Sequence, residues 1–196
     1  MGNRQPNCLF GRSPSKTTSK LTTMAKLAVS RIANLKNRHT VNLNIARSDA
    51  LLLLKEEGHP RLGHALTKAE LAIIEQKMLD MYAMIEVYCR LLIERIDVIV
   101  DSKECPSDLK EMVASLIFAA SRCGGFPELE KIRQMLTSKY GKDFACSAIQ
   151  IKNNCGVHPK MVSKFSSLPA SMEAKENLLK KIAKDNNIAY HTSLNN

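Results

Sequence analysis

The stretch MLDMYAMIEVYCRLLIERIDVIV, residues 78–100, decides the fold of this 196-residue chain. Its apolar side chains recur every three or four residues, and the recurrence begins one turn earlier. The members of this apolar stripe are Ile74, Met78, Met81, Ile85, Tyr88, Leu92, Ile96 and Ile99. At about 100° per residue, this spacing puts them all on one face of a helix. The stretch therefore predicts an amphipathic helix whose apolar face other helices must cover.

The predicted helix is long, because neither Pro nor Gly occurs between His64 and Cys105. About 38 residues at roughly 1.5 Å each span about 57 Å. A domain of this size cannot surround a helix of that length. We therefore expect a second long helix beside it, or a second subunit.

A second long helix is predicted from Lys16 to Glu57. Its apolar face contains Leu21, Met24, Ala28, Ile32, Leu35, Ala46, Ala50 and Leu53. Residues 39–44 are poor helix formers, so we expect curvature or fraying there. Gly58-His59-Pro60 should end the helix and form a turn. Two long amphipathic helices joined by a tight turn predict an antiparallel hairpin.

Shorter helices are predicted after Pro106. Ser107 is expected to cap the first of them, which should stop at Gly124-Gly125. Four more are predicted at 127–140, 142–152, 159–165 and 172–185, the last capped by Ser171. No strand pattern competes with these helices. The expected fold class is all-α, a helical bundle built on the hairpin.

The charge of the chain is strongly positive and unevenly distributed. The net charge is +10, and the first 48 residues contain nine Lys or Arg and no Asp or Glu. Such a segment suits an acidic membrane surface or a phosphate backbone, although a solvated lysine-rich face is the plainer interpretation. The candidate membrane-binding residues are Lys16, Lys20, Lys26, Arg31, Lys36 and Arg38. A nucleic-acid-binding module is the alternative, but residues 1–48 offer only Phe10 for base stacking.

The sequence contains no motif of a known catalytic, cofactor or metal site. G-x-G-x-x-G, P-loop, G-x-S-x-G and H-E-x-x-H motifs are absent, and the six cysteines lack zinc-ligand spacing. Cys155 and His158 could form a nucleophilic pair, but a surface loop is the favoured interpretation. The longest apolar runs are too short to span a bilayer. Because no signal peptide is evident, we expect reduced thiols in the cytosol.

Five blocks resemble the Ist1-like family, most closely its plant-type members. They are ARSDALLLLKEEGH (46–59), EVYCRLLIERIDVI (86–99), KECPSDLKEMVASLIFAASRC (103–123), PELEKIRQMLTSKYGKDF (127–144) and CGVHPKMVSKFS (155–166). These proteins are related to ESCRT-III and regulate the AAA ATPase of the multivesicular-body pathway. The resemblance extends from about Ala25 to Ile188.

The resemblance implies an ESCRT-III-like domain at 16–188, between a mobile segment at 1–15 and a short tail at 189–196. It implies a non-enzymatic adaptor without cofactors, cytoplasmic and peripheral to endosomes. Its partners would be the C-terminal helices of ESCRT-III subunits and an acidic membrane surface, with a homo- or hetero-oligomer possible. Apolar residues between Leu109 and Phe144 should leave a groove for such a helix.

Two departures from the family pattern stand out. The turn region GHPRLGHALTKAE (58–70) is two residues longer, with Thr67-Lys68 where an arginine-containing segment is common. After Ile188 only eight residues remain, too few for a helix that recruits the ATPase. On that ground we expect only indirect contact with the ATPase.

Overall fold

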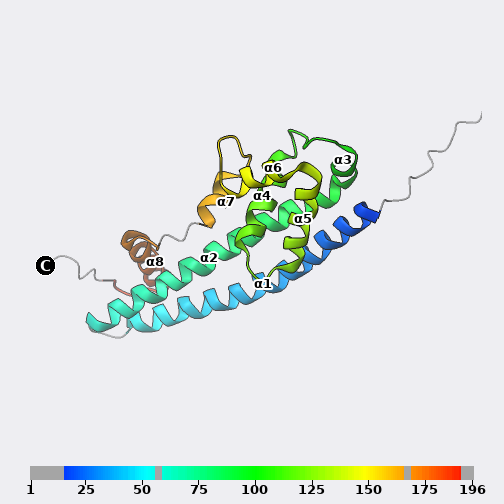
Figure 1. Ribbon diagram of the computed structural model, residues 1–196. Coiled ribbons are helices and arrows are strands. Elements are labelled where there is room, and N and C mark those ends of the chain that lie inside the picture. Colours follow the sequence, from blue (N-terminus) through cyan, green and yellow to red (C-terminus); the bar gives the residue numbers. More distant parts are fainter. Residues whose placement is uncertain (1–15, 56–58, 166–168, 191–196) are drawn as a thin grey trace, which may run out of the picture.

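The computed structural model describes residues 16–55, 59–165 and 169–190, and the regular elements within these ranges are all helices (Figure 1). Segment 1–15, predicted to be mobile, and residues 191–196 of the predicted tail lie outside them. In chain order the helices are α1 (Lys16–Lys55), α2 (His59–Glu94), α3 (Ile96–Asp101), α4 (Lys110–Arg122), α5 (Pro127–Tyr140), α6 (Lys142–Ile149), α7 (Pro159–Lys164) and α8 (Met172–Asp185). The all-α prediction is confirmed.

The predicted hairpin is present, with α1 and α2 side by side and antiparallel (Figure 1). Alanines fill much of the contact. Those buried are Ala25, Ala28, Ala46 and Ala50 of α1, and Ala65, Ala69 and Ala72 of α2. Small side chains let two helix backbones approach closely, and Ala also has the best helix propensity. Alanine therefore serves both helix formation and helix pairing here.

Helix α1 runs unbroken through residues 39–44, so the expected fraying there is wrong. His39 and Leu43 are buried against the hairpin partner. Packing of these side chains outweighs the weak local propensity of Thr40, Asn42 and Asn44, because most helix stability in proteins comes from tertiary contacts.

The predicted continuous helix to Cys105 is interrupted at Arg95, which separates α2 from α3. Arg95 leaves helical geometry, with φ −106° and ψ 19°. The hydrogen bonds Arg95 N to Leu91 O and Ile99 N to Arg95 O, both 3.0 Å, persist across the break. Ile96 and Ile99 stay buried on the same stripe. No Pro or Gly marks the break, and the chain leaves the helix at Ser102 rather than at Cys105.

Helices α4–α7 cover one end of the hairpin (Figure 1). Helix α4 is buried on nearly every side, from Met112 to Ala120. It is flanked by α5, which buries Leu129, Ile132 and Leu136. Together they cover the stripe from Met81 to Ile99 in one core. Each fully buried aliphatic side chain contributes about 1.5–3 kcal/mol relative to exposure.

Most helix ends lie where Gly, Pro and Ser predict them. Pro127 begins α5, Gly141 ends it with φ 91°, and Ser171 Oγ accepts from Ala174 N at 3.1 Å to cap α8.

Two helix ends differ from the prediction. Ser107 does not cap α4, because a turn closed by the hydrogen bond from Leu109 N to Pro106 O, 3.0 Å, delays the start of the helix to Lys110. Helix α6 stops at Ile149, before Ile151 takes the left-handed φ of 54°.

Helix α8 packs at the opposite end of the hairpin from the other short helices (Figure 1). Leu179 and Ile182 form a separate cluster with Ala50, Ala65 and Ala69. An ion pair between Lys175 Nζ and Glu70 Oε2, 3.0 Å, joins α8 to α2. The hairpin is thus covered at both ends by separate sets of apolar contacts.

Candidate partner-binding site

An apolar groove lies on α2, between the end of the hairpin that α4–α7 cover and the end that α8 covers. It encloses about 570 Å³ between α2, the C-terminal end of α4 and the chain around α7. Its lining consists of Glu70, Ile74, Lys77, Met78, Met81, Tyr82, Arg122, Cys123, Gly124, Lys164, Phe165 and Pro169. This volume is within the range of ordinary ligand pockets, but the groove is open along one side.

The floor of the groove is the N-terminal part of the apolar stripe. Ile74 is 46% exposed and Met78 is half-buried, whereas Met81 and Tyr82 are buried. Helices α4–α7 cover the stripe only from Met81 onward, so its first turns remain uncovered. Methionine side chains are flexible and adapt to irregular apolar partners.

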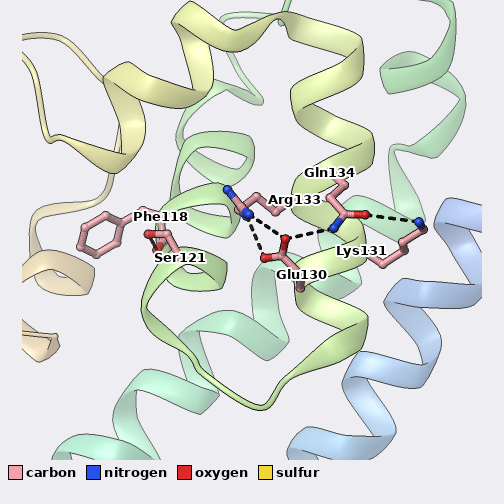
Figure 2. Close-up of polar contacts among 6 residues, drawn as sticks. All are labelled: Phe118, Ser121, Glu130, Lys131, Arg133 and Gln134. Carbon is pink, nitrogen blue, oxygen red and sulfur yellow. Dashed lines mark hydrogen bonds and ion pairs between the residues drawn. The ribbon is translucent and has the colours of Figure 1, made fainter.

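One wall is built from aromatic contacts between α4 and α7. The Phe118 ring meets Phe165 edge-on at 5.5 Å between centroids, and the Arg122 guanidinium lies 5.1 Å from the Phe118 ring centroid. Figure 2 shows the Phe118 ring directed away from α5. These contacts hold Phe165 and Arg122 in place at the groove.

The rim carries three cations and one carboxylate. Lys164 pairs with Asp80, and Glu70 pairs with Lys175. Lys77 has no ion-pair partner among the described residues. The rim is therefore net positive, which suits a partner helix with acidic flanks.

The groove expected between Leu109 and Phe144 remains a prediction, and of that range only Arg122, Cys123 and Gly124 line the groove described above. Within that range the large apolar residues Leu109, Met112, Leu116, Ile132 and Leu136 are buried. They cover the hairpin stripe and have no surface left for a partner. The open apolar surface is instead the part of the stripe that they do not reach.

The structure gives no support for nucleophilic chemistry at the groove or at Cys155 and His158. Burial raises the pKa of the groove residue Cys123 to about 12, so the thiol stays protonated. His158 Nδ1 accepts from Lys160 N at 3.0 Å and so caps α7, while His158 N donates to Ser115 Oγ at 3.0 Å. His158 therefore has a structural role.

The Glu130 carboxylate is bound within its own helix. Glu130 accepts from Arg133 Nε (2.8 Å) and Nη2 (2.6 Å) and from Gln134 Nε2 (3.1 Å), all within α5 (Figure 2). Within the described ranges, no group of three or more His, Cys, Asp or Glu side chains is arranged to hold a metal ion.

The six predicted membrane-binding residues all lie on α1, but they differ in whether they form an ion pair with another helix. Lys16, Lys20, Lys26 and Arg38 are exposed and have no ion-pair partner in the part of the chain that the structure describes. Arg31 Nε lies 2.6 Å from Glu128 Oε2. Lys36 Nζ lies 3.1 Å from Glu86 Oε2. The charges of these last two cations are already balanced within the fold.

None of the helices in the described ranges is both long and apolar enough to cross a membrane.

Comparison with known proteins identifies relatives of the whole helical domain. The family model "Ist1: Regulator of Vps4 activity in the MVB pathway" matches residues 22–189. An IST1-like protein of Dictyostelium discoideum is 36% identical over 165 residues, which are 81% of this chain and 42% of that protein. This chain thus spans less than half the length of that relative.

Among crystal structures, the N-terminal domain of S. cerevisiae Ist1, in complex with the Did2 MIM motif, has a similar fold. The TM-score is 0.76 at 24% identity, over 92% of this chain and 97% of that one. The sequence blocks, the hairpin fold and the family model agree, and the chain belongs to the Ist1 family.

Proposed function

We propose that this chain is a non-enzymatic adaptor of endosomal multivesicular-body sorting that binds the C-terminal helices of ESCRT-III subunits. Membership of a family described by regulation of Vps4 supports this role. So does the fold likeness to a yeast domain that was crystallised with a MIM motif. By binding subunits on which the ATPase acts, the protein would influence that ATPase at the cytoplasmic face of endosomes.

The groove between α2, α4 and α7 is the surface that best fits such a helix. A helix in a groove is recognised through apolar anchors at three- and four-residue spacing. Ile74, Met78 and Phe165 offer apolar contacts for such anchors. Lys77 and Arg122 lie where acidic flanks of the same helix would face them. The incomplete cover over Ile74 is the single observation that carries this assignment.

Calorimetry with synthetic C-terminal peptides of ESCRT-III subunits tests the proposal. At least one peptide should bind with micromolar affinity, equivalent to about 8 kcal/mol. Ile74→Asp should weaken this binding at least about tenfold, because it places a charge on the apolar floor. Leu71→Asp is the matched control, since Leu71 is 45% exposed on the same helix but does not line the groove.

Equal losses in the two variants would show that the groove is not the site. Failure of every subunit peptide to bind would reject the adaptor function itself.

We also propose that the exposed cations of α1 bind anionic membranes. Lys16, Lys20, Lys26 and Arg38 lie on a helix with no acidic residue before Asp49. Each basic residue near a membrane surface contributes about 1 kcal/mol. Reversing all four to Glu should abolish co-sedimentation with phosphatidylserine vesicles, and added salt should weaken it in the unmodified protein. Equal binding to neutral and anionic vesicles would reject this proposal.

A further inference from the structure

Helix α1 has an outer face on which cations and exposed aliphatic side chains alternate with polar ones. We define this outer face by Lys16, Lys20, Leu27, Arg38, Val41, Ile45 and Leu52. At about 100° per residue, these positions fall within an arc of about 60°. The buried positions of α1, among them Ala25, Ile32, Leu43 and Ala50, lie on the other side of the helix.

The aliphatic members of the outer face are unusually open to solvent. Leu27 is 47% exposed, Val41 57%, Ile45 54% and Leu52 60%. Single exposed aliphatic residues are ordinary, but Val41, Ile45 and Leu52 follow one another along one face of α1, with Leu27 farther along the same face, and such a row marks an interaction surface. In Figure 1, α1 forms one long edge of the molecule, and in this view no labelled helix lies beyond that edge. Packing among the described residues therefore leaves these four side chains largely open to solvent.

The charge pattern indicates what covers this row. No acidic residue occurs in α1 before Asp49, and Asp49 is paired with Lys68 at 2.8 Å. A second copy of a chain with net charge +10 would bring like charges together. A nucleic acid offers phosphates for the cations but no apolar phase for the aliphatic side chains, and α1 carries no Phe, Tyr or Trp on which bases could stack.

A partner helix is also a poorer fit than a bilayer. The hollow beside this face, lined in part by Leu27, Arg31 and Arg38, already contains the Glu128 carboxylate paired with Arg31. That carboxylate would repel an acidic helix and anionic headgroups alike, so the choice rests on the length of the outer face, which extends from Lys16 to Leu52. The interfacial region of an anionic bilayer, in contrast, offers both negative headgroups and an apolar phase along the whole of a long helix.

We propose that α1 lies in the plane of an anionic membrane, with Leu27, Val41, Ile45 and Leu52 inserted at the boundary between headgroups and acyl chains. Lys16, Lys20 and Arg38 then contact the headgroups. This inference rests on the proposed membrane function and adds that part of the binding is apolar. Salt therefore removes only part of the binding, because ions screen charges and leave apolar insertion intact.

Single-tryptophan variants test the insertion, since the chain has no Trp of its own. Ile45→Trp emission should shift to the blue on adding phosphatidylserine–phosphatidylcholine vesicles. Val87→Trp is the control, because Val87 is 62% exposed on α2, away from the outer face. Its emission should not change.

A second experiment measures the contribution of this row to affinity. The triple variant Val41→Ser, Ile45→Ser, Leu52→Ser should bind these vesicles about tenfold or more weakly with every charge unchanged, since burying aliphatic area drives insertion. Leu71→Ser with Val87→Ser is the matched control, because both residues are exposed aliphatics on α2. That control should bind like the unmodified protein.

The outcomes separate the inference from the function on which it rests. Vesicle binding without a blue shift at Ile45→Trp would overturn the insertion and leave the electrostatic proposal standing. No vesicle binding at all would reject both. A blue shift that grows with protein concentration in the absence of lipid would show a second copy on the face, and would also overturn the inference.

Discussion

The Arg31 guanidinium and the Glu128 carboxylate, 97 residues apart in the chain, form a two-pronged ion pair. Arg31 Nε donates to Oε2 at 2.6 Å and Nη2 donates to Oε1 at 2.8 Å. This contact fixes the start of α5 against α1. It also holds the pKa of Glu128 below its ordinary value of 4.5, chiefly through the hydrogen bonds from Arg31.

The first prediction is that Glu128→Gln makes stability less dependent on pH. A carboxyl whose pKa is lowered by folding stabilises the fold above its unfolded-state pKa, and this contribution is lost as pH falls through the folded-state pKa. Glu128→Gln should thus lower the thermal midpoint at pH 7, and the difference from the unmodified protein should shrink below about pH 4.5. Glu94→Gln, an exposed site, is the control. If the difference in thermal midpoint between Glu128→Gln and the unmodified protein stays constant from pH 7 to pH 3, the ionised Glu128 carboxylate does not contribute to stability.

The second prediction concerns the core stripe. Ile85 and Leu92 are fully buried, so Ile85→Asp or Leu92→Asp places an unpaired charge in the core. This costs more than the roughly 2–5 kcal/mol of truncation to Ala, and we expect insoluble or unfolded protein. Val87→Asp, on the same helix but 62% exposed, should stay folded. A folded Ile85→Asp variant with an unchanged thermal midpoint would show that the stripe is not the core.

The pattern of apolar residues predicts most of the fold because the period of a helix is a local property. The hairpin follows from that period, and Pro127, Gly141 and Ser171 define helix ends through their own backbone chemistry. The break at Arg95 carries no such signal. The start of α4 at Lys110 depends on a turn that competes with the cap expected of Ser107.

The interaction surfaces depend on contacts between distant segments and are harder to predict. The sequence places Arg31 and Lys36 among six similar cations, yet Glu128 and Glu86 neutralise these two. Likewise, Ile74 belongs to a stripe that predicts burial, but the short helices do not reach it. Which part of a stripe stays open depends on the lengths and positions of the helices that cover it.

The third prediction is that the rim charge of the groove affects the rate of partner binding. Lys77→Glu should slow the association of an acidic ESCRT-III peptide and reduce the salt dependence of its affinity, as is typical of a rim charge. Stopped-flow measurements at two salt concentrations would test this. Lys103→Glu makes the same charge change at an exposed site outside the groove lining. Equal slowing in both variants would indicate only a general field effect.

The fourth prediction is that α8 can be detached without unfolding the rest of the domain. Leu179 is fully buried, and it contacts the hairpin in a cluster separate from the main core. Leu179→Asp should therefore accelerate hydrogen exchange in 172–185 while α4 stays protected, because separate clusters open as separate units. Glu173→Ala, at the exposed first turn of α8, is the control. Equal loss of protection in α4 would show that the domain unfolds as one unit.

The fifth prediction concerns a buried polar pair within the hairpin. His39 Nδ1 lies 2.6 Å from Glu75 Oε2, and the His39 ring is 5.4 Å from that of Tyr82. His39 Nε2 is buried and has no hydrogen-bond partner among the described residues. Glu75 is therefore the one side chain in those ranges that satisfies the buried imidazole.

Replacing only one member of this pair should lower the free energy of unfolding more than replacing both. Glu75→Ala leaves a buried imidazole without a partner, which costs about 1–3 kcal/mol, whereas replacing both groups by apolar ones of similar size is close to neutral. For a domain of this size, 1 kcal/mol lowers the thermal midpoint by about 2–4 °C. We expect Glu75→Ala to be clearly destabilised, and His39→Leu with Glu75→Leu to recover most of the loss. A double-mutant cycle built from His39→Leu, Glu75→Leu and the double variant, followed by thermal unfolding, measures the coupling. If the two single changes simply add, His39 and Glu75 do not act as a pair, and the stability of the hairpin centre must come from its apolar contacts alone.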